Sequence, residues 1–261
     1  MGKTSIYSQM DQINENAGPL SMNLRIGGLY DSKVVTDEID DQNSADEGLS
    51  LNLDAGWQKS VTRSFGFRLR YNNHSVFYND LDEYDLIDQA ATLEGQWVTG
   101  RFIFSIPVGY NYILEDGHSD SRRITLTPTC MMLFAEGRQA VVIYGVYADI
   151  EDKDGIVPDE GGISSGGGLA YVFQREDKMR LSLSLAYQST KYDSAILDYD
   201  ACALPVNRRD KAAVANAGFY FPLSSRLGLY ADYTFLHNNS NVQAYDYDRH
   251  IIEGGLAVNV F

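Results

Sequence analysis

Residues 102–112 read FIFSIPVGYNY, and this stretch decides the fold class. Its even positions, from Phe102 to Tyr112, are all apolar or aromatic, whereas its odd positions include Ser105, Gly109 and Asn111. Successive side chains of a β-strand point to opposite faces, so a period of two predicts a strand with one apolar and one polar face.

The same alternation recurs along the rest of the chain. About twelve segments of about ten residues or more carry an apolar or aromatic side chain at every second position. It is clearest in 65–71, 179–187 and 227–235, and weaker in 20–30, 48–59, 85–98, 123–134, 139–150, 166–174, 211–221 and 249–261. The sequence therefore predicts an all-β protein of about twelve strands.

The connections between these segments alternate between short and long. The short set is 59–63, 98–100, 135–138, 175–178 and 222–225. The long set is 31–47, 79–85, 115–122, 151–165, 189–210 and 237–248. Outer-membrane barrels have short periplasmic turns and longer extracellular loops, and an even strand count leaves both termini on the periplasmic side.

A soluble β-sandwich or a lipocalin-like barrel would also alternate, but two features favour a membrane barrel. The polar faces are rich in Ser, Gly, Asn, Thr and Tyr rather than in Lys and Glu, so they suit a lumen better than a water-exposed surface. Aromatic residues also gather near segment ends, as interfacial girdles require. These residues are Tyr30, Trp57, Tyr71, Trp97, Tyr112, Tyr144, Tyr187 and Phe235.

We therefore predict a transmembrane, antiparallel, up-and-down β-barrel of about twelve strands in the bacterial outer membrane. Residues 20–261 form the barrel, with short periplasmic turns and long acidic extracellular loops. Residues 1–19 are expected to form a periplasmic extension or a plug remnant.

Composition narrows the possible partners. The chain has 261 residues and a formal net charge of −15, which repels phosphate backbones and argues against nucleic acid as a partner. Aromatic residues make up 12% of the chain, which argues against disorder. Two cysteines cannot form a disulfide framework or a four-thiolate metal site.

Charged side chains on the polar strand faces are expected to line the lumen. A charged group facing lipid near the bilayer midplane would cost about 2–4 kcal/mol, so these groups must point inward. The lumen charges predicted in this way are Arg25, Asp54, Arg68, Arg70, Glu94, Arg101, Arg180, Asp232 and Glu253, and Asp149 is assigned to the same face. They could form a salt-bridged, filled interior or line a conducting pore, and the sequence does not choose between the two.

Acidic side chains are concentrated in the predicted extracellular loops. Carboxylate oxygens are the ligands that Ca²⁺ and Mg²⁺ prefer, so these loops could bind divalent cations that are free or bridge lipopolysaccharide phosphates. Solvated surface loops are the simpler explanation of the charge and the one we favour, and no particular metal is identified. The candidate residues are Asp37, Glu38, Asp40, Asp41, Asp152, Asp154, Asp159 and Glu160.

Few residues of the chain could form a catalytic site. His237 and Ser240 resemble the His and Ser of outer-membrane phospholipase A, in which the His activates the Ser for acyl transfer, but the spacing differs and no orienting Asn is identified. We therefore expect no catalytic residues and no cofactor, and the chain is predicted not to be an enzyme. A membrane hydrolase is the weakest alternative.

Two places carry a family resemblance. The first strand ends in Gly27-Gly28-Leu29-Tyr30-Asp31-Ser32-Lys33, and the last hairpin reads SNVQAYDYDR over 240–249, followed by Gly254-Gly255-Leu256 and a terminal Phe261. Together they resemble the C-terminal barrels of surface lipoprotein assembly modifiers and related TPR-linked outer-membrane export proteins. The resemblance implies export of a lipoprotein or polymer, with periplasmic TPR or export partners.

The leading functional prediction is a channel, either a porin-like path for small solutes or an export conduit. The alternative is a non-conducting structural or adhesive barrel whose acidic loops bind cations or other ligands. The expected partners are outer-membrane lipids, lipopolysaccharide and the barrel assembly machinery.

Overall fold

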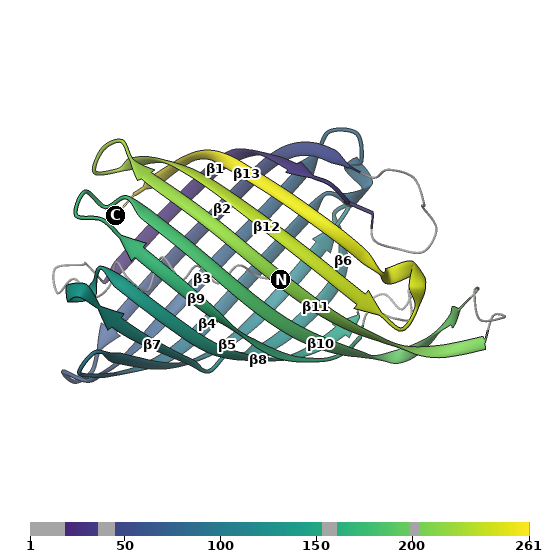
Figure 1. Cartoon of the computed structure of the whole chain (residues 1–261), viewed down its shortest axis with the longest axis horizontal. Helices are drawn as coiled ribbons and strands as arrows, with labels where there is room; N and C mark the ends of the chain where they lie inside the picture. The colour runs from purple at the N-terminus through teal and green to yellow at the C-terminus, as the bar shows by residue number, and fades with distance from the viewer. Residues whose placement is uncertain (1–18, 36–44, 153–160, 199–203, 261) are drawn as a thin grey trace.

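The computed structural model describes residues 19–35, 45–152, 161–198 and 204–260. Within them, thirteen strand segments form one antiparallel sheet that closes on itself (Figure 1). The segments are β1 (Leu20–Asp31), β2 (Asp46–Ser60), β3 (Phe65–Tyr78), β4 (Leu86–Thr99), β5 (Phe102–Glu115), β6 (His118–Leu126), β7 (Thr129–Phe134), β8 (Gln139–Asp152), β9 (Gly162–Gln174), β10 (Arg180–Asp198), β11 (Leu204–Pro222), β12 (Leu227–Ser240) and β13 (Tyr247–Asn259).

Segments β6 and β7 are two parts of one barrel strand. Leu126 pairs with Val108 of β5, and Thr129 pairs with Ser105 of the same strand, so the register is unchanged across the gap. Pro128 has no N–H to donate, which interrupts the ladder without displacing the chain. The barrel therefore has twelve strands, as predicted.

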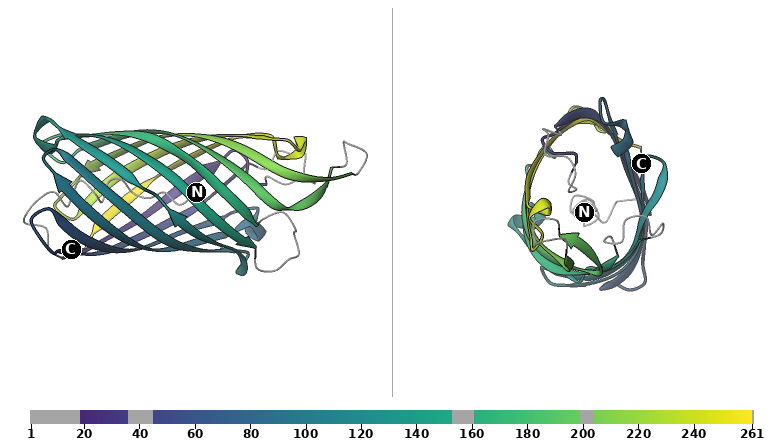
Figure 2. Two further views of the ribbon diagram at one scale, coloured as in Figure 1. Left: turned by 90° about the horizontal axis from the view of Figure 1, so that it is seen from below. Right: turned by 90° about the vertical axis from the view of Figure 1, so that its right-hand side faces the viewer.

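Closure is made by the first and last strands. Segment β1 pairs with β2 on one side and with β13 on the other, and every other strand pairs with its neighbours along the chain. This is an antiparallel up-and-down barrel, and its cross-section is oval (Figure 2). The predicted fold class is confirmed.

The two ends of the barrel differ. The turn end carries the connections β2–β3, β4–β5, β7–β8, β9–β10 and β11–β12, which are short. The loop end carries the other connections, including two one-turn helices, η2 (Asp82–Tyr84) and η4 (Gln243–Tyr245), while η3 (Ala135–Gly137) lies at the turn end. No described helix is long and apolar enough to cross a membrane.

Three predicted long loops are shorter than the sequence suggested. The prediction of a long loop over 115–122 is wrong. Asp116 and Gly117 both have positive φ (47° and 70°) and form a two-residue turn between β5 and β6. Segments β10 and β11 are each 19 residues long, so most of 189–210 is a hairpin ladder. Residues 237–240 likewise extend β12, and β13 begins at Tyr247.

Side chains are arranged inside out relative to a soluble protein. Leu93, Ile106 and Leu185 expose 57%, 60% and 64% of their surface on the outside, whereas Arg68 and Glu94 expose 1% and 0%. Exposing apolar side chains is favourable only where lipid replaces water, so the outer face of this barrel is a membrane-facing surface.

Aromatic side chains lie on the outer face near both ends. Trp57 and Trp97 are exposed towards the turn end, and Tyr30 and Tyr187 towards the loop end. Tyr144 differs from the prediction, because it shares the inward parity of the buried Val142 and covers Gly168 of β9.

Candidate functional site

All but one of the nine predicted lumen charges lie at inward positions of the strands. They come mainly from β1 to β4, β12 and β13, which are consecutive around the barrel because β13 pairs with β1. We call this set of strands the charged arc. Below the loop-end rim its inward charges are Arg25, Asp54, Arg68, Arg70, Asp88, Glu94, Asp232 and Glu253, and Asp31, Asp46 and Arg249 lie inward at the rim itself.

Two sequence assignments to the lumen need correction. Arg101 lies in the turn between β4 and β5, where it is exposed and its Cζ atom is 5.5 Å from the centroid of the Phe102 ring. Asp149 is exposed and has the same outward parity as Ile143 and Tyr147. A residue in a tight turn escapes the inward-outward alternation, and Asp149 was assigned the wrong parity.

A three-residue ion network joins β3 and β4, at one edge of the charged arc. Glu94 Oε2 is 3.4 Å from Arg68 Nη1 and 3.7 Å from Arg70 Nη2. All three side chains are at least 95% buried, and Gln96 donates to Glu94 at 2.9 Å. Two guanidinium groups share one carboxylate here, so removing that carboxylate would take a buried counter-charge away from both cations.

A second group of polar side chains joins β1, β2, β12 and β13. Arg25 Nη1 is 3.2 Å from Asp232 Oδ2, and both side chains keep some exposure, 19% and 14%. Across the closing seam, Glu253 accepts hydrogen bonds from Ser50 at 2.9 Å and from the Tyr230 hydroxyl at 2.8 Å. The Arg25–Asp232 pair is therefore the more solvent-accessible part of the charged arc.

Two further predicted lumen charges are Asp54 and Arg180. Asp54 accepts a hydrogen bond from Asn72 of β3. Arg180 lies at the turn end of β10, where it is 8% exposed and its Cζ atom is 5.8 Å from the centroid of the Tyr220 ring.

The middle of the wall across the lumen from the charged arc is neutral and small. Strands β9 and β10 stand about half a turn around the twelve-stranded barrel from β2 and β3. Arg180 lies at the turn end of this wall and Tyr192 at its loop end, but the inward positions between them include Ser164, Gly166, Gly168, Ala170, Ser182, Ser184 and Ala186. Such side chains leave room in the middle of the lumen and add no charge there.

Towards the turn end, part of the inner wall is apolar. Met131, Ala140, Val142, Ala170 and Val172 are 0–2% exposed and pack together with Ile103, Leu133 and Tyr144. The sequence analysis missed this patch. Its signal is that β8 is apolar on both faces, at Ala140 and Val142 as well as at Val141 and Ile143.

At the loop end, two arginine clusters that the sequence analysis also missed tie strands together. Arg249 of β13 donates through Nε to Asp31 of β1 at 2.9 Å, and the Tyr78 hydroxyl donates to Asp31 at 3.1 Å. Arg208 of β11 donates to Asp210 at 2.6 Å.

Arg208 also holds the loop between β12 and β13. Its Cζ atom lies 3.4 Å from the centroid of the Tyr245 ring and 4.5 Å from that of Tyr192. Asn238 donates to the Tyr245 carbonyl at 2.7 Å, and Val242 and Tyr245 are 1% and 8% exposed. The turn η4 is therefore packed against the inner face of the barrel wall.

The predicted cation-binding loops cannot be located. Asp37, Glu38, Asp40, Asp41, Asp154, Asp159 and Glu160 lie outside the described residues, and of Asp152 only the backbone is described. Residues 1–18 and Phe261 also lie outside them. Within the described part of the chain, no group of three or more His, Cys, Asp or Glu side chains is arranged to hold a metal ion.

The hydrolase pairing of His237 with Ser240 is not formed. The two residues are three positions apart on β12, so their side chains lie on opposite faces of the sheet. His237 is exposed on the outside, with Nδ1 2.7 Å from Asp248 Oδ1, whereas Ser240 accepts a hydrogen bond from the Val242 N–H. His237 therefore cannot activate Ser240 in this structure.

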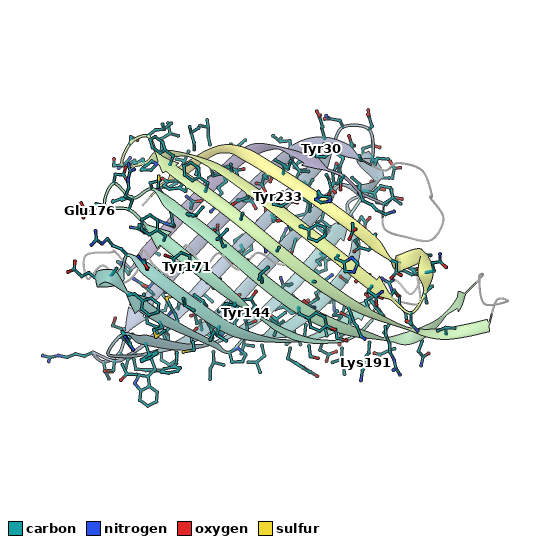
Figure 3. All side chains as sticks on the ribbon, in the orientation of Figure 1. Tyr30, Tyr144, Tyr171, Glu176, Lys191 and Tyr233 are labelled. Carbon is teal, nitrogen blue, oxygen red and sulfur yellow. The ribbon has the colours of Figure 1, made fainter. Side chains whose placement is uncertain are left out.

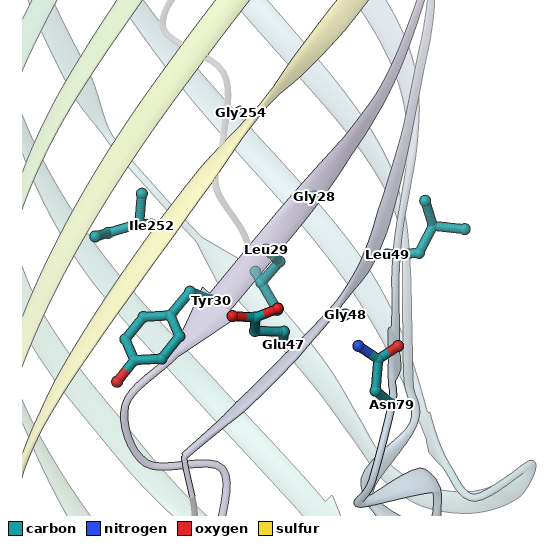
Figure 4. A pocket seen from close by; sticks show the side chains of 9 residues that line it. All are labelled: Gly28, Leu29, Tyr30, Glu47, Gly48, Leu49, Asn79, Ile252 and Gly254. Atoms are coloured by element: carbon teal, nitrogen blue, oxygen red, sulfur yellow. The ribbon is translucent and has the colours of Figure 1, made fainter.

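A shallow hollow lies on the outer face near the loop end (Figure 4). Gly28 and Gly254 open it, because neither glycine presents a side chain towards lipid, and Tyr30, Leu49 and Ile252 stand around it. It is separate from the lumen and holds none of the predicted site residues.

Comparisons with known proteins bear on the fold. No family model and no curated protein sequence matches the chain. The fold is similar to that of the COG4313 outer membrane channel from Pseudomonas putida F1, with a TM-score of 0.60, 11% identity, and coverage of 93% of this chain and 96% of that one.

Two further solved structures are also similar. The Salmonella typhi outer membrane phospholipase dimer has a TM-score of 0.51 at 13% identity, covering 98% of this chain and 97% of that one. An anion-selective porin from Comamonas acidovorans has a TM-score of 0.48 at 10% identity, covering 92% and 98%. Similarity at these identities is a similarity of fold.

The closed sheet, its lipid-facing apolar surface and its charged interior define the class. The chain has the fold of the bacterial outer-membrane β-barrels.

Proposed function

We propose that this protein is an outer-membrane channel that passes small, charged or polar solutes along its lumen. The observation that carries the proposal is the division of the inner wall into a charged arc and a facing wall of Gly, Ala and Ser. Barrels of eight strands are filled by their side chains, whereas barrels of 16–18 strands hold wide aqueous channels. A twelve-stranded barrel lies between these sizes. Small side chains on one side of its lumen therefore favour a narrow path.

The charge of the arc suggests the direction of selectivity. Apart from Asp31, Asp46 and Arg249 at the loop-end rim, it carries three arginines, Arg25, Arg68 and Arg70, against the five carboxylates of Asp54, Asp88, Glu94, Asp232 and Glu253. Arg123 and Arg180 lie at inward positions of other strands, so the surplus of carboxylates is local to the arc. Such a surplus raises the concentration of cations along the arc, so we expect a weak cation preference.

Conductance of the refolded chain in a planar bilayer, under a salt gradient, tests the proposal. We expect discrete current steps and a reversal potential that indicates cation preference. Asp232→Asn should lower that preference, because it removes an accessible carboxylate beside Arg25. Arg101→Gln is the matched control and should leave the selectivity unchanged, since Arg101 lies in a turn outside the charged arc.

A non-conducting structural barrel is the second candidate. It is favoured by the burial of Arg68, Arg70 and Glu94, which serve as a cross-strand brace more readily than as a contact for solutes. Silent bilayers containing protein with verified β-sheet content would reject the channel and support this alternative. The export role implied by the resemblance to lipoprotein assembly modifiers stays a prediction, as do its periplasmic partners and the barrel assembly machinery.

A further inference from the structure

A cluster of basic side chains lies on the outer face at the loop end of β10 and β11. Lys191 and Arg209 are paired across the two strands, and Lys211 follows two residues along β11. All three are exposed, and all have outward parity, like Tyr187 and Ala213 below them. Figure 3 shows Lys191 at the outer edge of the barrel near its loop end. We call these three residues the basic patch.

The basic patch lacks carboxylate partners in the described part of the chain. None of its three side chains forms an ion pair there, although the chain carries a net charge of −15. Like charges facing each other across strands repel, so the arrangement disfavours the isolated barrel unless an anion binds between them. Lys211 is flanked by Ser189 and Asn239, whose side chains can add hydrogen bonds to such an anion.

The surface below the basic patch is shaped for acyl chains. Strand β11 presents Ala213, Ala215 and Ala217 outward, between larger side chains on both neighbouring strands. Leu185 and Leu183 flank it on β10, and Phe235 and Tyr233 on β12. These three alanines, the alanine row, are a line of small side chains that runs down β11 from Lys211 into the lipid-facing surface.

The height of the basic patch matches a lipid headgroup. Tyr187, exposed on the outer face of β10, has the amphipathic ring of a membrane-interface residue. Lys191 lies four residues further along the strand, which is about 13 Å at 3.3–3.4 Å per residue and less along the membrane normal. The three cations therefore lie just beyond the interface, where the phosphates of outer-leaflet lipids are found.

We propose that Lys191, Arg209 and Lys211 bind the phosphorylated headgroup of lipopolysaccharide, with an acyl chain packed against the alanine row of β11. Guanidinium and ammonium groups are the side chains best suited to phosphate, and each contributes about 1 kcal/mol at an anionic membrane surface. The inference rests on the outer-membrane placement in the proposed function but not on conduction.

The test is a titration of the full-length barrel, folded in a neutral detergent, with diphosphorylated lipid A. The patch variant carries Lys191→Gln, Arg209→Gln and Lys211→Gln together. The control variant carries Lys59→Gln, Arg63→Gln and Arg226→Gln, which removes three exposed cations from the turn end. We expect the patch variant to bind at least about tenfold more weakly, and the control variant to bind within about twofold of the parent.

Dephosphorylated lipid A with the same acyl chains separates charge from shape. It should bind the parent as weakly as the intact lipid binds the patch variant. Equal binding of both lipids by the parent, or an equal loss in the control variant, would overturn the proposal. So would dimerisation of the lipid-free parent that the patch substitutions abolish, since the face would then serve a second copy of the barrel.

Folding and function are monitored separately. All three patch side chains are exposed, so the triple variant should keep the circular dichroism spectrum of the parent. If it does not, the single variant Lys211→Gln replaces it, with an expected loss of about threefold or more. Loss of lipid binding with unchanged conductance would leave the channel proposal intact, and silent bilayers would not affect the binding result.

Discussion

Among single residues, Glu94 is the side chain on which the buried Arg68 and Arg70 depend. Arg68 and Arg70 both reach its carboxylate, and both arginines are buried, with 1% and 5% of their surface exposed. Burying a cation without its partner is far more costly than losing an exposed ion pair.

Glu94→Gln should therefore lower the free energy of unfolding by about 3–5 kcal/mol. Urea titration of the barrel in lipid vesicles, followed by tryptophan fluorescence, measures this change. Glu176→Gln is the control, because the Glu176 side chain is 83% exposed and pairs with Arg138 in a turn. It should cost about 1 kcal/mol or less, and equal losses for the two variants would contradict the assignment.

Neighbouring glycines on β1 give a second residue-scale prediction. A Cβ on Gly27 would collide with the Tyr230 hydroxyl and the Gly254 carbonyl oxygen inside the barrel, whereas a Cβ on Gly28 would meet nothing within 4 Å. Gly27→Ala should lower the free energy of unfolding by about 1–3 kcal/mol, and Gly28→Ala should leave it unchanged or raise it slightly. The same urea titration compares them, and a harmless Gly27→Ala would disprove the tight packing of Tyr230.

At the element scale, the loop between β12 and β13 is held inside the rim by one arginine. Arg208 lies against the rings of Tyr192 and Tyr245 while its guanidinium donates to Asp210. Its neighbour Arg209 points outward on the same strand, so the two residues form a matched pair for substitution.

Arg208→Gln should release the turn η4 and speed chymotrypsin cleavage after Tyr245 by about tenfold, since a desolvated cation–π contact contributes about 2 kcal/mol. Limited proteolysis of the folded barrel, with fragments assigned by mass, measures the rate. Arg209→Gln should be cleaved at the parental rate. A parental rate for Arg208→Gln as well would show that Asn238 and Val242 hold the loop without the arginine.

Element boundaries were predicted less well than element faces. Asp116 and Gly117 form the two-residue hairpin turn that this dipeptide favours, a local signal that the period-two reading passed over. The full length of β10 and β11 had no such signal, because residues beyond the apolar belt alternate only weakly. There the backbone ladder continues from the pair Ala195 and Asn207 to the pair Asp198 and Leu204.

At the scale of the whole molecule, the barrel is an inverted protein whose outer surface requires lipid. Leu185 is 64% exposed on the outer face of β10, and Leu223 is 51% exposed in the turn after β11. Only the first of these positions is well inside the apolar belt.

Leu185→Arg should make folding into lipid vesicles less favourable by about 2–4 kcal/mol, because its charge would face hydrocarbon. Leu223→Arg should cost about 0–1 kcal/mol, because a turn residue reaches the aqueous interface. Folding yields over a urea series measure both variants. Equal costs would place Leu185 outside the membrane and overturn the assignment of the outer face.

Two features are readable from the order of the residues alone: the chain forms a barrel of about twelve strands, and most strands turn a known face to lipid. Both follow from a local rule, since the pleat of a strand sends alternate side chains to opposite sides and lipid accepts only the apolar set. The same rule placed Arg25, Arg68, Arg70, Glu94 and Asp232 inward, and it failed for Arg101 because a turn residue does not obey the alternation.

Only the tertiary structure decided which of these groups meet. Arg25 and Asp232 are 207 residues apart in the chain, and Asp31 and Arg249 are 218 apart, yet each pair is in contact. They meet because β13 closes on β1 in one particular register, and a period of two specifies the face of a side chain but not its height along the barrel. The alternation along the chain therefore predicts which charged side chains line the lumen, and the strand register decides which of them are in contact.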